Sequence, residues 1–290
     1  MKSQGLPRDT SYDASEALEF FRSVGKPQEI GQGKKIFAES EKGLPLLLMP
    51  HRMYLLLEGE VSVLMNDELI ATVRQGEVFG EMAAISQAPR SATAVAKTSC
   101  RVISLSDRQF HAALSKKPRF ALALMSVMIG RLRETIGRLN GVSTGTGWRE
   151  AAALDKELLA EVEGRLGTKA RFRFGEGKII MREGHLGVAL YVVLEGRIAV
   201  RVGDTLVEKA GPGGIIGEMG LIDRKPRLAT ATAETDCTLL AISRLDFLKL
   251  VKENPRFGVS LLAAVSERAR SMAERLQTAT HTGRALLPGA

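Results

Sequence analysis

An internal repeat constrains the fold more than any other feature of the sequence. A shift of 137 residues aligns YLLLEGEVSV, which begins at Tyr54, with YVVLEGRIAV, which begins at Tyr191. The same shift aligns GEVFGEMAAISQAPRSATAVA, from Gly76, with GGIIGEMGLIDRKPRLATATA, from Gly213. One offset held over about 70 residues indicates two copies of a single structural unit.

The two copies differ in length near their beginnings. GQGKKIFAES, from Gly31, matches GEGKIIMREG, from Gly175, only at an offset of 144 residues. The first copy therefore has seven extra residues, the difference between 144 and 137. We expect them in a loop near Leu44 to Pro50.

The two cysteines, Cys100 and Cys237, are also one repeat apart. Equivalent positions in two separate domains should be far from each other, which argues against a disulfide. We expect two buried structural thiols.

Each copy reads as short strands separated by glycine turns and followed by helices. The segment from Tyr191 to Val202 is rich in β-branched and aliphatic residues, with turns at Gly196 and Gly203. Helical periodicity begins after Asp107 and again after Leu245. This pattern predicts a sandwich or jelly roll in each copy.

The 290 residues are enough for two domains, each with its own core. We predict a first domain at 1–141, a linker at 142–148 and a second domain at 149–290. The stretch NGVSTGTG at 140–147 has linker composition, and the WREAAALDKELLAEVEG that follows it is expected to be helical.

Composition and charge argue against a membrane or secreted protein and bear on whether the chain binds nucleic acid. The chain is 44% apolar and 26% charged, as in a soluble globular protein. No stretch approaches the roughly 18 apolar residues of a membrane span, and the N-terminus lacks a secretory signal, so we expect a cytoplasmic protein. The net charge of +8 raises the possibility of nucleic-acid binding. The basic clusters are interrupted by glutamates, and we interpret them as solvated helix faces. They are Arg131, Arg133 and Arg138, and then Arg268, Arg270 and Arg275.

A short cassette occurs once in each copy and carries the chemistry. It reads Gly-Glu-Met, six further positions, then Pro-Arg-x-Ala-Thr. A glycine turn before a short helix of small residues leaves backbone N–H groups that favour an anion. The arginine nine residues after the glutamate can bind two phosphate oxygens with its forked guanidinium. The glutamate suits a ligand that also donates a hydroxyl. A phosphate and a free ribose hydroxyl on one compact ligand describe a 3′,5′-cyclic nucleotide.

The cassette resembles the phosphate-binding cassette of the cyclic nucleotide-binding domain family. That family includes catabolite activator proteins and the regulatory subunits of cyclic AMP-dependent protein kinase. The resemblance covers about residues 20–140 and 160–278. It implies two tandem double-stranded β-helix (jelly-roll) domains in a mainly β fold with flanking helices (α+β), each followed by a C-terminal helix.

The resemblance also implies roles for individual residues. Glu81 and Glu218 would accept from the ribose hydroxyl, and Arg90 and Arg227 would bind the cyclic phosphate. The alternatives are degenerate sites and simple Glu81–Arg90 and Glu218–Arg227 ion pairs. The predicted ligand-binding residues are Gly80, Glu81, Met82, Ala83, Arg90, Ser91 and Ala92 in the first copy, and Gly217, Glu218, Met219, Gly220, Arg227, Leu228 and Ala229 in the second.

The two predicted sites differ after the arginine. Ser91 offers a hydroxyl to a phosphate or a purine edge, whereas Leu228 does not. Cyclic AMP is the expected ligand at both sites, and cyclic GMP stays open at the first.

The helices after each barrel have heptad spacing. In the first copy Met125, Ile129, Leu132, Ile136 and Leu139 form the seam, and in the second Val265, Ala269, Met272 and Leu276. Each seam could pack on its own barrel, form a homodimer, or pair with the other inside one chain. Trp148 is assigned a packing role at the start of a helix, with stacking on a base as the alternative.

The sequence indicates a sensor that signals to a partner protein, and not an enzyme. No helix-turn-helix is expected after Leu276, and residues 1–25 contain no paired-arginine motif of the kind expected in a kinase inhibitory segment. No catalytic constellation stands out, and the four histidines lack metal-ligand spacing. The alternatives are a nucleic-acid regulator that uses the basic helices and a structural module whose sites do not bind.

Overall fold

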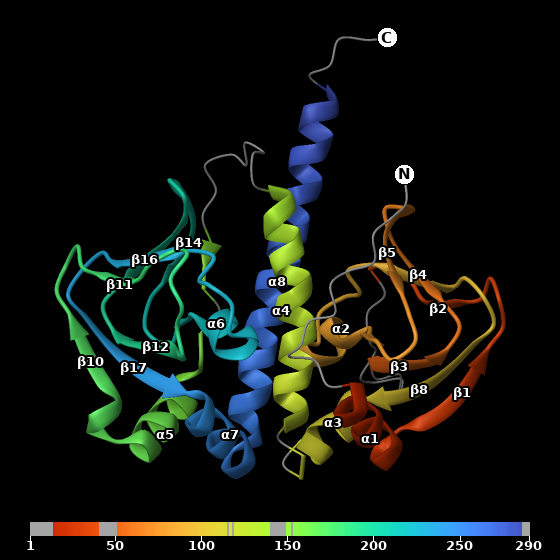
Figure 1. Ribbon diagram of the computed structural model, residues 1–290, viewed down its shortest axis with the longest axis horizontal. Helices are drawn as coiled ribbons and strands as arrows, with labels where there is room; N and C mark the ends of the chain where they lie inside the picture. The colour runs from red at the N-terminus through yellow and green to blue at the C-terminus, as the bar shows by residue number, and fades with distance from the viewer. Residues whose placement is uncertain are drawn as a thin grey trace.

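The computed structural model describes residues 14–40, 51–139 except 115 and 118, and 149–285 except 152. Two β-rich domains flank a central pair of long helices (Figure 1). Every strand of each domain has a counterpart in the other, apart from one added edge strand. The repeat in the sequence is therefore a repeat in the fold.

The first domain has eight strands and four helices among the described residues. It runs α1 (Ala14–Val24), β1 (Lys26–Ile30), β2 (Lys35–Phe37), β3 (Arg52–Glu58), β4 (Val61–Met65), β5 (Glu68–Val73), β6 (Val78–Phe79), α2 (Glu81–Ser86), β7 (Thr93–Ala96), β8 (Cys100–Ser106), α3 (Asp107–Leu114) and α4 (Arg119–Leu139). The strands form two antiparallel sheets, in the orders β1-β8-β3-β6 and β2-β7-β4-β5. This is the predicted jelly roll.

The second domain repeats this order. It runs β9 (Arg149–Glu150), α5 (Lys156–Leu166), a 3₁₀ turn (Thr168–Ala170), β10 (Arg171–Phe174), β11 (Ile179–Met181), β12 (Ala189–Glu195), β13 (Ile198–Val202), β14 (Thr205–Ala210), β15 (Ile215–Ile216), α6 (Glu218–Asp223), β16 (Thr230–Ala233), β17 (Cys237–Ser243), α7 (Arg244–Glu253) and α8 (Pro255–Ala285). Its sheets have the orders β10-β17-β12-β15 and β11-β16-β13-β14-β9.

The length difference between the copies lies between β2 and β3. Gly33 and Gly177, at the offset of 144, both have positive φ, at 76° and 74°. From β3 onward the strands follow the offset of 137. The loop predicted to hold the extra residues, Leu44 to Pro50, lies outside the described residues.

The segment after the linker is not a single helix, which corrects the prediction for WREAAALDKELLAEVEG. Arg149 and Glu150 instead form β9, which pairs in parallel with the edge strand β14. The helix begins only at Lys156, because the Asp155 carboxylate caps it by accepting from the Leu158 N–H at 2.8 Å. An unpaired sheet edge outweighed the helix propensity of the alanines. The linker at 142–148 and Trp148 lie outside the described residues.

Among the described residues, buried side chains form four clusters, the smallest of which lies between the two long helices. Each sandwich has an interior cluster of its own, one around Leu56 and Val102 and the other around Val193 and Leu239. A larger cluster joins the helices and the outer sheet faces of both domains. Cys100 and Cys237 are both buried and free, as predicted.

The long helices α4 and α8 pack against each other within one chain, so the described parts of the two heptad seams meet inside the chain (Figure 1). Met125 and Ile129 of α4 share a buried cluster with Val265 of α8, and Leu132 shares another with Ala269 and Met272. Each helix also packs on the other copy's cassette helix, α4 on α6 and α8 on α2. The side chains of Ile136, Leu139 and Leu276 lie outside the described residues.

Candidate functional site

Each predicted cassette forms a tight turn into a short helix. Glu81 begins α2 and Glu218 begins α6. The glycines before them, Gly80 and Gly217, have φ of 71° and 77°, a left-handed conformation that favours glycine. A Cβ at Gly80 would lie 3.0 Å from the Phe37 ring and 3.1 Å from Nη1 of the cassette arginine.

The cassette arginines lie at these turns. Arg90 is 6% exposed and donates from Nη1 to the Gly80 carbonyl at 2.8 Å and from Nη2 to the Arg52 carbonyl at 2.8 Å. Its guanidinium carbon lies 4.1 Å from the centre of the Phe37 ring, a cation–π arrangement. The structure therefore places the guanidinium beside the first residue of α2.

Arg227 is held in the same way in the second copy. It donates from Nη1 to the Gly217 carbonyl and from Nη2 to the Ala189 carbonyl, the latter at 2.7 Å. Burial lowers the pKa of the Arg227 guanidinium from its ordinary value, and Tyr191 and Glu218 oppose this shift. The group remains a cation, because arginine begins far above neutral pH.

The two cassette glutamates are paired with arginines of the long helices. Glu81 is 1% exposed, and its Oε1 accepts from Nη1 of Arg131 at 2.5 Å. Arg131 also donates to the Val78 carbonyl at 2.6 Å. In the second copy Arg268 donates to Glu218 Oε1 at 2.5 Å and to the Ile215 carbonyl at 3.0 Å. Each cassette is thereby tied to the helix that follows its own barrel.

The second copy adds another carboxylate to this pair. Glu208 of β14 accepts from Nη2 of Arg268 at 2.9 Å and from Nε at 3.0 Å. Burial alone would lower the pKa of Arg268, but the two carboxylates outweigh burial and raise it. Only 12% of the Arg268 side chain is exposed, against 39% for Arg131. The matching position in the first copy is Ala71, which is exposed and has no carboxylate.

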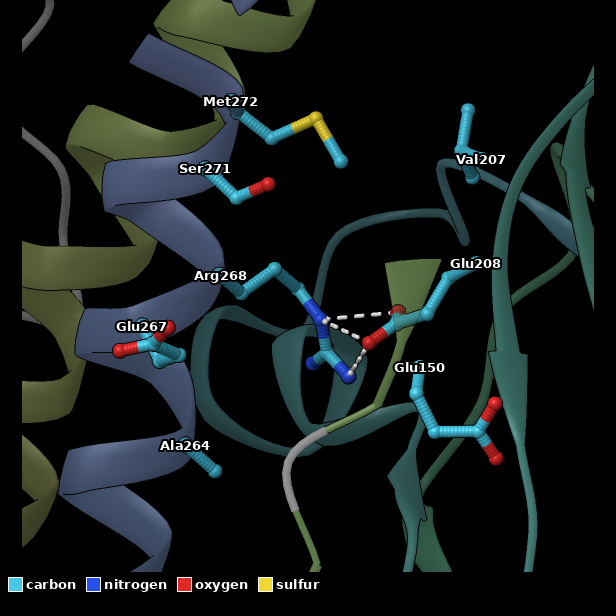
Figure 2. Close-up of a pocket in the computed structure, with 8 residues that line it drawn as sticks. All are labelled: Glu150, Val207, Glu208, Ala264, Glu267, Arg268, Ser271 and Met272. Atoms are coloured by element: carbon cyan, nitrogen blue, oxygen red, sulfur yellow. Dashed lines mark hydrogen bonds and ion pairs between the residues drawn. The ribbon is translucent and has the colours of Figure 1, made fainter. Parts of the chain in front are cut away.

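A small cavity adjoins this network between α8 and β14 (Figure 2). Arg268 and Glu208 meet at its centre; Ser271 and Met272 line it from the side of α8, and Val207 lines it from the side of β14. Arg268 also contacts Glu218, so the cavity borders the glutamate end of the cassette. The cavity is lined by Glu150, Val207, Glu208, Ala264, Glu267, Arg268, Ser271 and Met272.

The remaining predicted residues divide between packing and the cassette surface. Met82 and Met219 pack against the cluster of Leu132, Ala269 and Met272 between the two long helices. A Cβ at Gly220 would lie 2.9 Å from Nη1 of the cassette arginine, so a small residue is required there. Ala83 and Ala92 are buried, and Ser91, Leu228 and Ala229 are half-buried.

Sequence reasoning missed four arginines of the long helices. Their interpretation as solvated helix faces is wrong for Arg131, Arg133, Arg268 and Arg270, because each hydrogen-bonds inside the protein. The signal was present in the sequence: Arg131 and Arg268 are 137 residues apart, and so are Arg133 and Arg270. A repeat that preserves a charged residue at a helix position indicates a specific contact.

This arrangement suits a ligand that carries both an anion and a hydroxyl. The buried guanidinium beside the start of a short helix offers donors to a phosphate. The cassette carboxylate, which is paired with an arginine of a long helix, offers an acceptor to a hydroxyl. Among the described residues, no cluster of His, Cys, Asp and Glu could hold a metal ion. None of the described helices is both long and apolar enough to span a membrane.

Comparisons with known proteins identify the repeated unit. The family model described as "Cyclic nucleotide-binding domain" matches residues 49–117 and 171–254, which is more than half of the chain. The two matched segments contain the first and second cassettes, respectively. This match supports a cyclic nucleotide-binding regulatory protein.

Individual relatives are similar over part of their length. A cGMP-dependent protein kinase of Toxoplasma gondii is 28% identical over 194 residues, which cover 66% of this chain and 17% of the kinase. A cyclic AMP receptor protein of Thermus thermophilus is 36% identical over 115 residues, which cover 38% of this chain and 53% of that protein. The chain thus spans between about a sixth and about a half of these two relatives.

Solved structures are similar as well. The regulatory domain of Toxoplasma gondii PKA with cAMP is 22% identical, with a TM-score of 0.31, over 91% of this chain and 90% of that one. The Thermus thermophilus catabolite activator protein is 31% identical, with a TM-score of 0.39, over 44% of this chain and 61% of that one. With the repeated cassette and the family match together, the chain belongs to the cyclic nucleotide-binding domain family.

Proposed function

We propose that the chain is a sensor that binds a cyclic nucleotide in each domain and signals to a partner protein through the movement of α4 and α8. The observation that supports this proposal is that each cassette contains the predicted ligand-binding residues and is also bonded to a long helix. The arginine that would bind the phosphate hydrogen-bonds the glycine directly before the glutamate, and the glutamate is bonded to an arginine of a long helix.

The contacts of the first copy give the mechanism. A cyclic phosphate would accept from Arg90, whose guanidinium lies at the start of α2. The ribose hydroxyl would donate to Glu81, which also holds Arg131 of α4. A shift of Glu81 on binding therefore changes the position of α4, and α4 packs on α8. A ligand that binds one arrangement of these helices more tightly shifts the population toward it.

Cyclic AMP is the proposed ligand at both sites, with cyclic GMP kept open at the first because Ser91 has no counterpart in Leu228. The relatives whose names mention these nucleotides include a kinase that depends on cGMP and a receptor for cyclic AMP. The effector would be a protein.

We further propose the domain limits 1–141 and 149–290, with a linker at 142–148. We also propose a cytoplasmic location and action by binding without catalysis.

The nucleic-acid alternative loses support from the contacts of the basic helices. Arg131, Arg133 and Arg268 form ion pairs with carboxylates of the protein itself. Their charges are therefore not available to phosphates of a duplex, and the counterion release that drives such binding is reduced.

Isothermal titration of the full chain with cyclic AMP and cyclic GMP tests the proposal. We expect two binding events, and one after Arg90→Lys or Arg227→Lys, because lysine cannot reproduce the fork. The affected site should lose about 1.5–3 kcal/mol, at least tenfold in affinity. Arg101→Gln is the control, because it removes an arginine whose ion pair with Glu58 is more than half exposed. No heat with either nucleotide at millimolar concentration would refute binding.

A further inference from the structure

Each long helix has one arginine that contacts the cassette of the other copy. Arg133 of α4, in the first domain, forms a forked ion pair with Asp223 at the end of α6. Its Nη2 also donates to the Pro226 carbonyl at 3.1 Å. The side chains are 14% and 0% exposed, so the pair is largely removed from water.

The contact lies within the second cassette. Asp223 is the last residue of α6, and Pro226 directly precedes Arg227. The Asp223 carboxylate also accepts from the Lys225 N–H at 3.0 Å. Arg133 therefore joins both ends of the short segment between the helix of Glu218 and the predicted phosphate-binding arginine. This segment has little regular structure of its own, so a fixed cation from outside restricts its position.

The corresponding contact at the first cassette is weaker. Arg270 of α8 donates from Nη2 to the Ser86 hydroxyl at 3.0 Å. Its Nε is buried and has no hydrogen-bond partner among the described residues. Ser86 occupies the place of Asp223, 137 residues earlier. A second contact from α8 runs from the Ser266 hydroxyl to the Met82 carbonyl at 3.2 Å and joins two neutral groups.

We propose that Arg133 is a positioning residue of the second domain's site, although it belongs to the first domain. Asp223 in the second copy corresponds to Ser86 in the first, so only the second cassette offers a carboxylate to the arginine from the opposite domain. This difference makes the two sites unequal. The first domain holds the second cassette with a forked ion pair, whereas the contacts of Ser266 and Arg270 with the first cassette are to neutral acceptors. This inference rests on the proposed function, because it concerns the binding of cyclic nucleotide at the same cassettes.

Titration of single-site proteins with cyclic AMP tests the inference. Arg90→Lys isolates the second site and Arg227→Lys isolates the first. In these backgrounds Arg133→Gln should weaken the second site by roughly 2- to 30-fold, the usual range for residues that act through others. The first site should change by less than about twofold. Arg133→Lys, which keeps the charge and loses the fork, should fall in between.

The reciprocal variant adds a charge where the first copy lacks one. Ser86→Asp offers Arg270 a carboxylate, so the first site should gain affinity by a similar factor of roughly 2- to 30-fold. The second site should be unaffected. Because Ser86 is half-buried at the end of α2, this variant is expected to fold even if Arg133→Gln does not.

The outcomes separate the two proposals. If the unaltered chain binds neither cyclic nucleotide, the proposed function fails and this inference fails with it. If the chain binds two molecules but Arg133→Gln and Ser86→Asp change neither site, or change both sites equally, the inference alone is overturned. Thermal unfolding by circular dichroism on each variant confirms that the folded state is being titrated.

Discussion

The buried network around Arg268 leads to a quantitative prediction about stability. Arg268→Met removes the cation that lies between Glu208 and Glu218. These carboxylate side chains are 12% and 4% exposed, so both would be left with little solvation. Removal of one partner from a buried ion pair costs about 3–5 kcal/mol, because the remaining charge is uncompensated.

The first copy provides a matched comparison. Arg131→Met removes the cation beside Glu81, and the position that matches Glu208 is an alanine, Ala71. The Arg131 side chain is also 39% exposed, so water already weakens its ion pair. Arg131→Met leaves one buried carboxylate, Glu81, where Arg268→Met leaves two, so we expect a smaller loss of about 1–3 kcal/mol.

Urea unfolding followed by circular dichroism measures both losses. The double variant Arg268→Met/Glu208→Leu should recover part of the loss, because one buried carboxylate then remains in place of two. Glu208→Leu alone should cost less than Arg268→Met, since Glu218 still compensates Arg268. The double-mutant cycle isolates the coupling between Arg268 and Glu208. Equal losses for Arg131→Met and Arg268→Met, or no recovery in the double variant, would refute this account of the network.

Two further predictions concern glycines and a helix cap. Gly187→Ala should weaken cyclic AMP binding at the second site, because a Cβ there would lie 2.2–2.4 Å from the guanidinium of Arg227. Gly130→Ala is its control: nothing lies within 4 Å of that Cβ, and the helix should gain about 0.5–1 kcal/mol in urea unfolding. Ser243→Ala removes the capping box with Asp246 at the start of α7 and should cost about 0.5–2 kcal/mol, measured by thermal unfolding; an unchanged transition would contradict it.

Local sequence patterns predicted most of the fold. The strand at Tyr191 and the turns at Gly196 and Gly203 are present because alternation and positive φ are properties of a few adjacent residues. The cassette was also readable, because its glycine, glutamate and arginine are close in sequence. The strand at Arg149–Glu150 was not, because it forms only where the edge of β14 lies beside it.

The sequence alone determined that the chain contains the same unit twice, and which glutamate and arginine each unit brings to its turn. The tertiary structure decided what those residues contact. Arg131 lies 50 residues from Glu81, and Arg133 lies 90 residues from Asp223. No helix or strand periodicity predicts a contact between residues so far apart in the chain. The carboxylates of Glu81 and Asp223 are 1% and 0% exposed, so each requires a cation, and the packing of α4 brings Arg131 and Arg133 within reach of them.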